Sequence, residues 1–145
     1  MTVGGTYTVV IELLDRAAIE VGALGTRTFD PGWYAYCGSA LGTGGFSRVD
    51  RHRELAAGER DVRHWHIDYL LGHTGASIDL VTTTADIDGE CVVANALDGQ
   101  RIPDFGCSDC PCCSHLVYSP QRAPLLSSIE CAHRTLAEDG TLAGD

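Results

Sequence analysis

The sequence predicts a small α+β domain in which a mainly antiparallel, three-stranded central sheet is flanked by helices. Two observations lead to this class. Strand-like and helix-like segments follow one another without the regular strand–helix–strand alternation that is typical of parallel sheets. The 145 residues are 44% hydrophobic, and the apolar positions are spread along the chain, so that one domain can bury a core of its own.

Three segments have the character of sheet strands. Residues 6–13, TYTVVIEL, alternate and are rich in β-branched side chains. Residues 33–38, WYAYCG, are aromatic, and residues 77–84, SIDLVTTT, are β-branched. We expect these three segments to form the central sheet. Short strands at 18–21 and 115–118, a turn at 22–32 and an irregular loop at 100–113 are also expected.

Several further segments have the apolar spacing or the terminal residues of helices. Residues 46–57 place Phe46 and Val49 on one face, and Gly58 follows as a stop. Other helices are expected at 64–71, at 89–97 and from Ser127 or Ser128 to Leu136, followed by a frayed tail from residue 138.

The charge balance is unusual, because 20 acidic residues face 10 basic ones and every basic residue is arginine. The net charge of −10 and the absence of lysine indicate adaptation to a salt-rich cytoplasm, in which high ionic strength screens self-repulsion. An ordinary acidic protein is the alternative. Acidity argues against nucleic-acid binding, yet half of the arginines fall between residues 48 and 63, interrupted by four acids.

Neither a membrane span nor a secretory leader is expected. No apolar run approaches the ~20 residues that a spanning helix needs, and the first residues lack a basic start and a small-residue cleavage site. The seven cysteines are an odd number, which does not favour a disulfide framework. We therefore expect a cytoplasmic protein.

Two tyrosines, a glycine and an arginine form the first candidate site. If the first two strands of the sheet pair antiparallel, Tyr7 comes near Tyr36, and Gly38 ends the second strand. Arg48 follows early in a helix. Arginine presents a planar fork that matches phosphate oxygens, and a tyrosine hydroxyl can relay a proton when its pKa is lowered. Strand tyrosines that only pack in a core are the alternative interpretation.

The strings around these residues resemble the GIY-YIG nuclease superfamily. Gly5–Tyr7 reads GTY, Tyr36–Gly38 reads YCG, and Arg48–His52 reads RVDRH. Longer strings, in order and at similar spacing, resemble the Uri-type branch: GTYTVVIEL, PGWYAYCGSALGTGG, HWHIDYLL, GECVVANAL and FGCSDCPCCSHLVY. Because the resemblance spans about residues 5–119, we expect a GIY-YIG-like domain at 1–119 and a helical extension with a frayed tail at 120–145.

The resemblance implies hydrolysis of a phosphodiester with one divalent ion, Mg²⁺ or Mn²⁺. Tyr7 would activate the attacking water as a general base, and Tyr36 would support the water network. Arg48 would stabilise negative charge on the phosphate, and His52 would hydrogen-bond or relay protons. Glu90 would hold the metal ion. One hard cation on one carboxylate, together with one arginine fork, offsets the charge that develops in such a transition state.

The chain departs from the superfamily pattern at two places. The first motif reads GTY rather than GIY, which keeps its tyrosine. The late asparagine has no clear match, and Ser114 or His115 stands in its place. The residues expected to contact the nucleic acid are Gly38, Ser39, Arg51, His64, His66, Asp68, Ser114 and His115.

The string HWHIDYLL places His64, His66 and Asp68 within five residues. A strand would align all three side chains, whereas a helix would bring His64 beside Asp68. These side chains either line the substrate groove or pair with one another, and both interpretations stay open.

Four cysteines crowd into residues 107–113. Tetrahedral zinc takes four nitrogen or sulfur ligands, and Cys107, Cys110, Cys112 and His115 would supply them. Buried thiols and a loop that faces the substrate are the alternatives to a structural zinc site.

The expected function is therefore a metal-dependent endonuclease that hydrolyses phosphodiester bonds of nucleic acid, with DNA favoured over RNA. The alternatives are a non-catalytic nucleic-acid-binding module, serving for example a DNA-repair enzyme, and a zinc-stabilised interaction module on the same scaffold. No membrane partner is expected.

Overall fold

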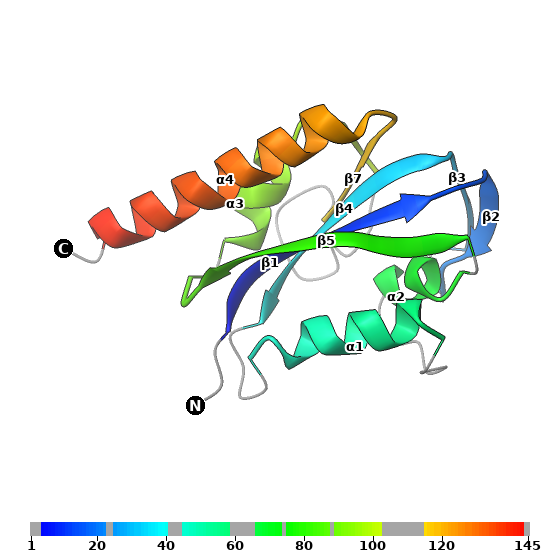
Figure 1. The fold of residues 1–145 in the computed structure, drawn as a ribbon, viewed down its shortest axis with the longest axis horizontal. Helices are drawn as coiled ribbons and strands as arrows, with labels where there is room; N and C mark the ends of the chain where they lie inside the picture. Colours follow the sequence, from blue (N-terminus) through cyan, green and yellow to red (C-terminus); the bar gives the residue numbers. More distant parts are fainter. Residues whose placement is uncertain are drawn as a thin grey trace.

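An antiparallel sheet forms the centre of the molecule (Figure 1). The computed structural model describes residues 4–22, 25–40, 45–58, 66–73, 75–87, 89–102 and 115–143, without the side chains of Arg48, His66, Glu90, Cys91 and 139–143. Within these ranges, five strands pair in the order β5–β1–β4–β7–β6. They are β1 (Gly5–Leu13), β4 (Gly32–Ala40), β5 (Ala76–Ala85), β6 (Gln100–Arg101) and β7 (Leu116–Ser119).

The central position of β1 follows from its composition. This strand pairs with β4 on one side and β5 on the other, and every residue of it except Glu12 is buried. A strand that is covered on both faces is expected to be a near-continuous run of apolar and β-branched residues. The register places Tyr7 directly opposite Gly38 on β4 and Thr83 on β5.

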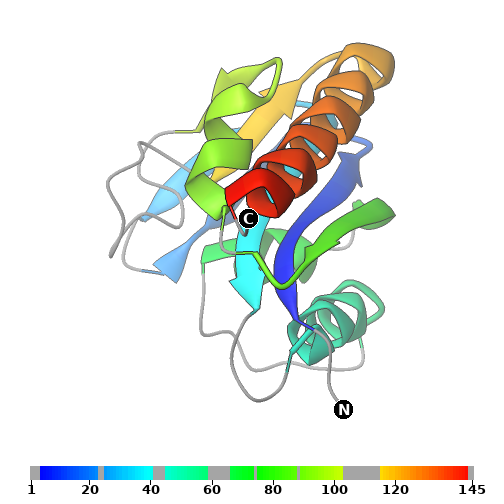
Figure 2. The same cartoon turned by 90° about the vertical axis from the view of Figure 1, so that its left-hand side faces the viewer.

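Helices cover both faces of the sheet, so that the fold has three layers. Figures 1 and 2 show α1 and α2 on one side of the sheet and α3 and α4 on the other. None of the helices in the described ranges is long and apolar enough to cross a membrane. The bounds are Ser47–Ala56 for α1, His66–Leu71 for α2, Glu90–Ala96 for α3 and Arg122–Ala143 for α4.

The two faces of the sheet bury separate apolar cores. One core joins Val9 of β1 to Leu55 of α1 and Leu70 of α2. The other joins Val10 of β1 to Ile129 of α4. Because side chains alternate along a strand, neighbouring residues of β1 stabilise opposite layers. Each fully buried Leu or Ile contributes about 1.5–3 kcal/mol to this packing.

The predicted α+β class is confirmed, and several predicted elements agree with the structure within two residues. α2 occupies 66–71 of the helix predicted at 64–71, and residues 64 and 65 lie outside the described ranges. The elements that agree are those predicted at 6–13, 18–21, 33–38, 46–57, 77–84, 89–97 and 115–118.

The prediction of a three-stranded sheet is wrong, because β7 and β6 extend the sheet beyond β4. β7 pairs with β4 from Trp33–Ser119 to Tyr36–Leu116, and the Ile102 N–H donates to the Leu116 carbonyl at 2.9 Å. The loop expected at 100–113 thus begins with a strand, and residues 103–114 lie outside the description. β6 has only two residues, so its sequence carries no periodicity and its pairing with β7 determines it.

The turn predicted at 22–32 contains a strand, β3 (Thr26–Phe29), which pairs with β2 (Ala17–Glu20) in a separate hairpin. Phe29 is buried in the core between the main sheet and helices α1 and α2, and this packing stabilises the hairpin. The glycines and the proline that suggested a turn belong only to the ends of the segment, such as Gly25, whose φ is 77°.

The last helix is longer than predicted at both ends. α4 begins at Arg122 and continues to Ala143, through the tail that was expected to be frayed. Pro124 lies in the first turn, where a missing N–H costs no helical hydrogen bond. Leu125, Ile129 and Leu136 are buried against the sheet face. The domain boundary after residue 119 stays a prediction.

Candidate functional site

Four elements of the fold meet at one end of the sheet. β1 begins there at Gly5, which lies between Ala40, the last residue of β4, and Ala85, the last residue of β5. A methyl group on Gly4 would lie 3.1 Å from Cα of Gly45, so the loop that enters α1 approaches the same point. The start of β1, the ends of β4 and β5 and the residues before α1 therefore lie together at this end of the sheet.

The fourth element, α3, is attached here by the side chain of Thr6. The Thr6 hydroxyl donates to the Ile87 carbonyl at 2.6 Å and accepts from the Gly89 N–H at 2.7 Å. The Asp86 N–H donates to the Gly4 carbonyl at 2.8 Å, in a turn where Asp86 has a φ of 63°. Glu90 directly follows Gly89 and begins α3. Sequence reasoning missed the role of Thr6, since a threonine in a strand is ordinary.

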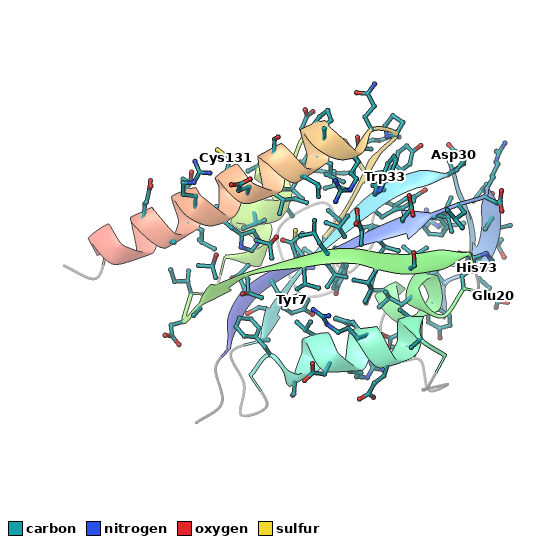
Figure 3. All side chains as sticks on the ribbon, viewed as in Figure 1. Tyr7, Glu20, Asp30, Trp33, His73 and Cys131 are labelled. Carbon is teal, nitrogen blue, oxygen red and sulfur yellow. The ribbon has the colours of Figure 1, made fainter. Side chains whose placement is uncertain are left out.

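Tyr7 is hydrogen-bonded to a histidine that arrives from α1. The Tyr7 hydroxyl lies 2.9 Å from Nε2 of His52, and the two ring centroids are 5.5 Å apart. Tyr7 is 1% exposed and His52 is fully buried. Figure 3 labels Tyr7 in the layer between the sheet and α1. Which group donates depends on the histidine tautomer, so this pair can exchange or share one proton.

Position 38 requires glycine because the Tyr7 side chain occupies the space that a larger side chain would need. A methyl group at Gly38 would overlap the Tyr7 ring and hydroxyl, and would come within 2.9 Å of Cε1. Gly38 was predicted to contact the nucleic acid, whereas its observed contact is with the predicted general base.

Tyr36 and His115 extend the cluster around His52. Tyr36 is half-buried, and its ring is edge-on to His52 at 6.0 Å and to His115 at 6.5 Å. His115 is buried, and its carbonyl accepts from the Cys37 N–H at 2.9 Å, which ties it to β4. The structure thus brings Tyr7, Tyr36, His52 and His115 into one group of aromatic rings.

Arg51 and Asp68, both predicted to contact nucleic acid, bind each other. Each terminal nitrogen of Arg51 donates to one carboxylate oxygen of Asp68 at 2.8 Å. The Asp68 side chain is fully buried on α2. The hydrogen bonds to Asp68 are the main cause that raises the pKa of Arg51; burial opposes them, and attraction to Asp68, Tyr7 and Glu54 adds to them. The pair joins α1 to α2.

The helices that carry Arg48 and Glu90 both begin at this end of the sheet. Arg48 is the second residue of α1, and Glu90 is the first residue of α3. α1 and α3 cover opposite faces of the sheet (Figure 2). The backbones of these two residues therefore lie at the same end of the sheet as Tyr7, but on opposite faces of the sheet.

The remaining predicted site residues are placed as follows. Ser39 lies opposite Thr6, on the face of the sheet that does not carry Tyr7, because side chains alternate along β4. His66 is the first residue of α2, and its side chain lies outside the description. Other predicted positions outside the described ranges are His64, Ser114, Cys107, Cys110 and Cys112.

A buried polar network on the opposite face was not predicted from the sequence. His133 of α4 places Nε2 2.7 Å from the Thr8 hydroxyl and Nδ1 2.8 Å from the Thr84 hydroxyl. Burial lowers the pKa of His133 to about 4, so the ring is neutral at pH 7. An open depression of about 450 Å³ lies beside it, lined partly by Ile87 and Arg134. A lone histidine in a helix carries no sequence signal for this role.

The resemblance to the GIY-YIG superfamily assigns one ion, Mg²⁺ or Mn²⁺, to the carboxylate of Glu90. Among the residues whose side chains are described, no group of three or more His, Cys, Asp or Glu lies together as a metal site. Mg²⁺ is commonly bound by one or two carboxylates and keeps several waters. Glu90 is the first residue of α3 and directly follows the anchored Gly89, so the backbone of the expected ligand lies at this end of the sheet.

The comparison with known families agrees with this arrangement. The family model described as "Domain of unknown function DUF123" matches residues 6–138. No curated protein and no solved structure matches the chain. The match covers every strand and helix described above except the first residue of β1 and the last residues of α4. The chain therefore belongs to the DUF123 family, which is a GIY-YIG-like family.

Proposed function

We propose that this protein is a metal-dependent endonuclease of the Uri-type branch of the GIY-YIG superfamily, which hydrolyses phosphodiester bonds of DNA. The observation that carries the proposal is the hydrogen bond between the Tyr7 hydroxyl and Nε2 of His52, packed directly over Gly38. A phenol is a useful base only if its proton has an acceptor or its ionised form is stabilised. A histidine at hydrogen-bond distance supplies the acceptor.

In this proposal, Tyr7 takes the proton of the attacking water, and His52 holds the phenolic proton or receives it. Tyr36 packs edge-on against His52 and restricts the plane of its ring. His115 packs against Tyr36 in turn. A base that is held in one orientation contributes more to the rate than a mobile one, because no orientation entropy is lost in the transition state.

Arg48 and Glu90 would complete the site from the first turns of α1 and α3. Arg48 would donate to the non-bridging phosphate oxygens, whose negative charge grows in the transition state. Glu90 would hold one Mg²⁺ or Mn²⁺, which when bound stabilises charge on the phosphate and the leaving oxygen. Thr6, the residue before Tyr7, binds the Gly89 N–H and so holds the backbone of Glu90 at the end of β1.

Cleavage of labelled DNA tests the proposal. Single-stranded, duplex and branched DNA are incubated with the protein in molar KCl, with Mg²⁺, with Mn²⁺ and with EDTA. We expect cleavage that needs the divalent ion and that is lost in Y7F, R48A and E90Q. Intact DNA under every condition would contradict the proposal.

A non-catalytic nucleic-acid-binding module is the second candidate, and the burial of Tyr7 favours it. The Tyr7 ring is 1% exposed, so packing in the core explains its position without a catalytic role. Such a module would bind DNA with equal affinity as wild type and as E90Q, and neither form would cleave it. Binding without turnover in both forms therefore separates this candidate from the nuclease.

We place the protein in a salt-rich cytoplasm, where it would meet DNA and a DNA-repair enzyme as its partner. The net charge of −10 and the absence of lysine support this environment. High salt weakens the gain from counterion release, so that short-range arginine contacts would supply most of the affinity. A zinc-stabilised interaction module would use Cys107, Cys110, Cys112 and His115 as ligands. The metal content of C110S, compared with that of wild type, would test it.

A further inference from the structure

β5 forms one edge of the five-stranded sheet, and no strand in the described ranges pairs with its outer side. Figure 2 shows β5 next to β1, at the outer side of the sheet. In an antiparallel pair, a strand directs only part of its N–H and C=O groups toward its neighbour, and the others point outwards. An edge of this kind is a template for the backbone of a further strand.

Most of β5 lacks the features by which proteins usually protect a sheet edge, namely short strands, prolines, lysines and bulges. The opposite edge strand, β6, has two residues, whereas β5 has ten and contains neither proline nor lysine. Its one charged residue, Asp79, lies where the register with β1 shifts, and it binds Arg122 of the same chain at 2.7 Å. The regular stretch from Leu80 to Ala85 is therefore open to pairing.

Apolar side chains of β5 are only partly covered on both faces of the sheet. Ile78 and Val81 pack against the core beside α1 and α2, and Leu80 packs against the core beside α4. All three side chains are half-buried. A further strand along this edge would cover them from the side and bury apolar area in both layers.

A second copy of β5 fits this edge by its own symmetry. Directly opposite residues of an antiparallel pair point to the same face of the sheet, so a two-fold axis at one residue of β5 matches the faces of the two copies. An axis at Thr82 leaves every central pair uncharged, and pairs of threonine and β-branched residues stabilise antiparallel strands. The resulting pairs are Thr82 with Thr82, Val81 with Thr83, and Leu80 with Thr84.

The open depression between α4 and β5 complements the second copy in this register. Its lining includes Thr84 of β5 and Arg134 of α4. Leu80 of the second copy comes opposite Thr84, beside this depression, and Asp79 of the second copy comes to the level of the last residue of β5, where Arg134 lies. The Arg134 guanidinium donates to Glu130 through Nη2 and keeps further N–H groups for another carboxylate. Opposite charges therefore meet at each end of the paired strands.

We propose that this protein forms a two-fold dimer in which β5 pairs antiparallel with β5 of a second copy, so that the two sheets become one. In strand addition of this type, the main-chain hydrogen bonds supply affinity and the alternate side chains supply specificity. A two-fold pairing also closes the assembly, because it occupies the β5 edge of both copies. The proposal does not depend on the nuclease function.

Sedimentation equilibrium of the full chain tests the dimer. Molar KCl is used because it screens the repulsion between two chains that each carry a net charge of −10. At high protein concentration we expect a mass of twice the 15.5 kDa of one chain, with dissociation on dilution. A protein that stays at 15.5 kDa at every concentration would overturn the proposal.

Variants of Thr82 test the register, because a residue on the two-fold axis meets its own copy. T82E and T82K each place two like charges opposite one another, which should raise the dissociation constant of the dimer by about tenfold or more. An equimolar mixture of T82E and T82K should associate again. T28E and T28K change an exposed threonine of β3 and should behave as wild type. A dimer that T82E and T82K leave intact, or a mixture that stays monomeric, would contradict pairing at Thr82.

Hydrogen exchange of the wild-type protein gives a readout that needs no variant. We expect amides between Leu80 and Ala85 to exchange more slowly at high protein concentration than after dilution, because the second copy protects them. Amides of β1, which is paired on both sides within one chain, should be equally protected at both concentrations. Exchange at β5 that does not change with concentration would contradict the proposed pairing.

Discussion

The hydroxyl of Thr6 accepts a hydrogen bond from the backbone N–H of Gly89, 83 residues further along the chain, at 2.7 Å. Thr6 precedes Tyr7 and Gly89 precedes Glu90. One buried hydroxyl thus ties the strand of the proposed base to the helix of the proposed metal ligand. This long-range contact holds the start of α3 at the end of β1.

Replacing Thr6 by valine should lower both stability and activity. T6V keeps the shape of the side chain but leaves the Gly89 N–H and the Ile87 carbonyl without the hydroxyl that they contact. A buried polar group that loses its partner costs about 1–3 kcal/mol. Urea unfolding measures the loss, and the Mg²⁺ concentration needed for cleavage should rise.

T83V is the matched control for T6V. Thr83 lies opposite Tyr7 on β5, but its side chain is exposed. Exposed substitutions of this kind usually change stability by less than about 0.5 kcal/mol. Equal effects of the two variants would show that the Thr6 hydroxyl has no special role.

The G38A variant should fold less stably and lose cleavage. The added methyl group would overlap Tyr7, and overpacking a close contact of this kind costs about 1–3 kcal/mol. G75A is the control, because a methyl group there meets its nearest neighbour, His73, at an ordinary 3.5 Å. Thermal unfolding and single-turnover cleavage measure both variants. A fully active G38A would refute a tight Tyr7–Gly38 contact.

Removing one partner of the buried ion pair should be costly. D68A leaves the Arg51 charge without its carboxylate, and we expect a loss of about 3–5 kcal/mol of unfolding free energy. D79A removes the partner of Arg122 in an exposed pair, whose loss should change stability little. Chemical denaturation compares them, and a D68A protein as stable as D79A would be the contrary result.

Stability should fall in acid through His133. Because burial lowers its folded pKa to about 4, the unfolded chain binds a proton on this ring between about pH 6.5 and 4, whereas the folded chain does not. The contribution is complete above pH 6.5 and is lost progressively toward pH 4. H133Q keeps hydrogen-bonding capacity without this titration. Urea unfolding between pH 4 and 7 should show a shallower pH dependence for H133Q than for wild type.

The sequence predicted the parts of the fold that local patterns determine. β1 and β5 follow from β-branched runs, and α1 from its apolar spacing and the glycine after it. β6 and β3 depend on their pairing partners, and their short segments carry little periodicity of their own. The length of α4 follows from an apolar stripe that only the sheet face explains.

The candidate site shows the same division. Tyr7 was a candidate from the strand pattern and His52 from the resemblance to the GIY-YIG superfamily, and the structure places them within hydrogen-bond distance. Arg51 and Asp68 were expected to contact the substrate, but the structure pairs them with each other. The anchor at Thr6 and the network at His133 involve ordinary residue types, whose roles appear only when distant segments meet.

Single-turnover cleavage of duplex DNA by wild type and Y7F, in molar KCl with Mg²⁺, tests the central claim most directly. Y7F removes one hydroxyl and keeps the ring that packs over Gly38. We expect the cleavage rate to fall by about 10²–10⁴-fold, as for loss of a general base, with DNA affinity unchanged. A Y7F protein that cleaves as fast as wild type would contradict the assignment of Tyr7 as the base.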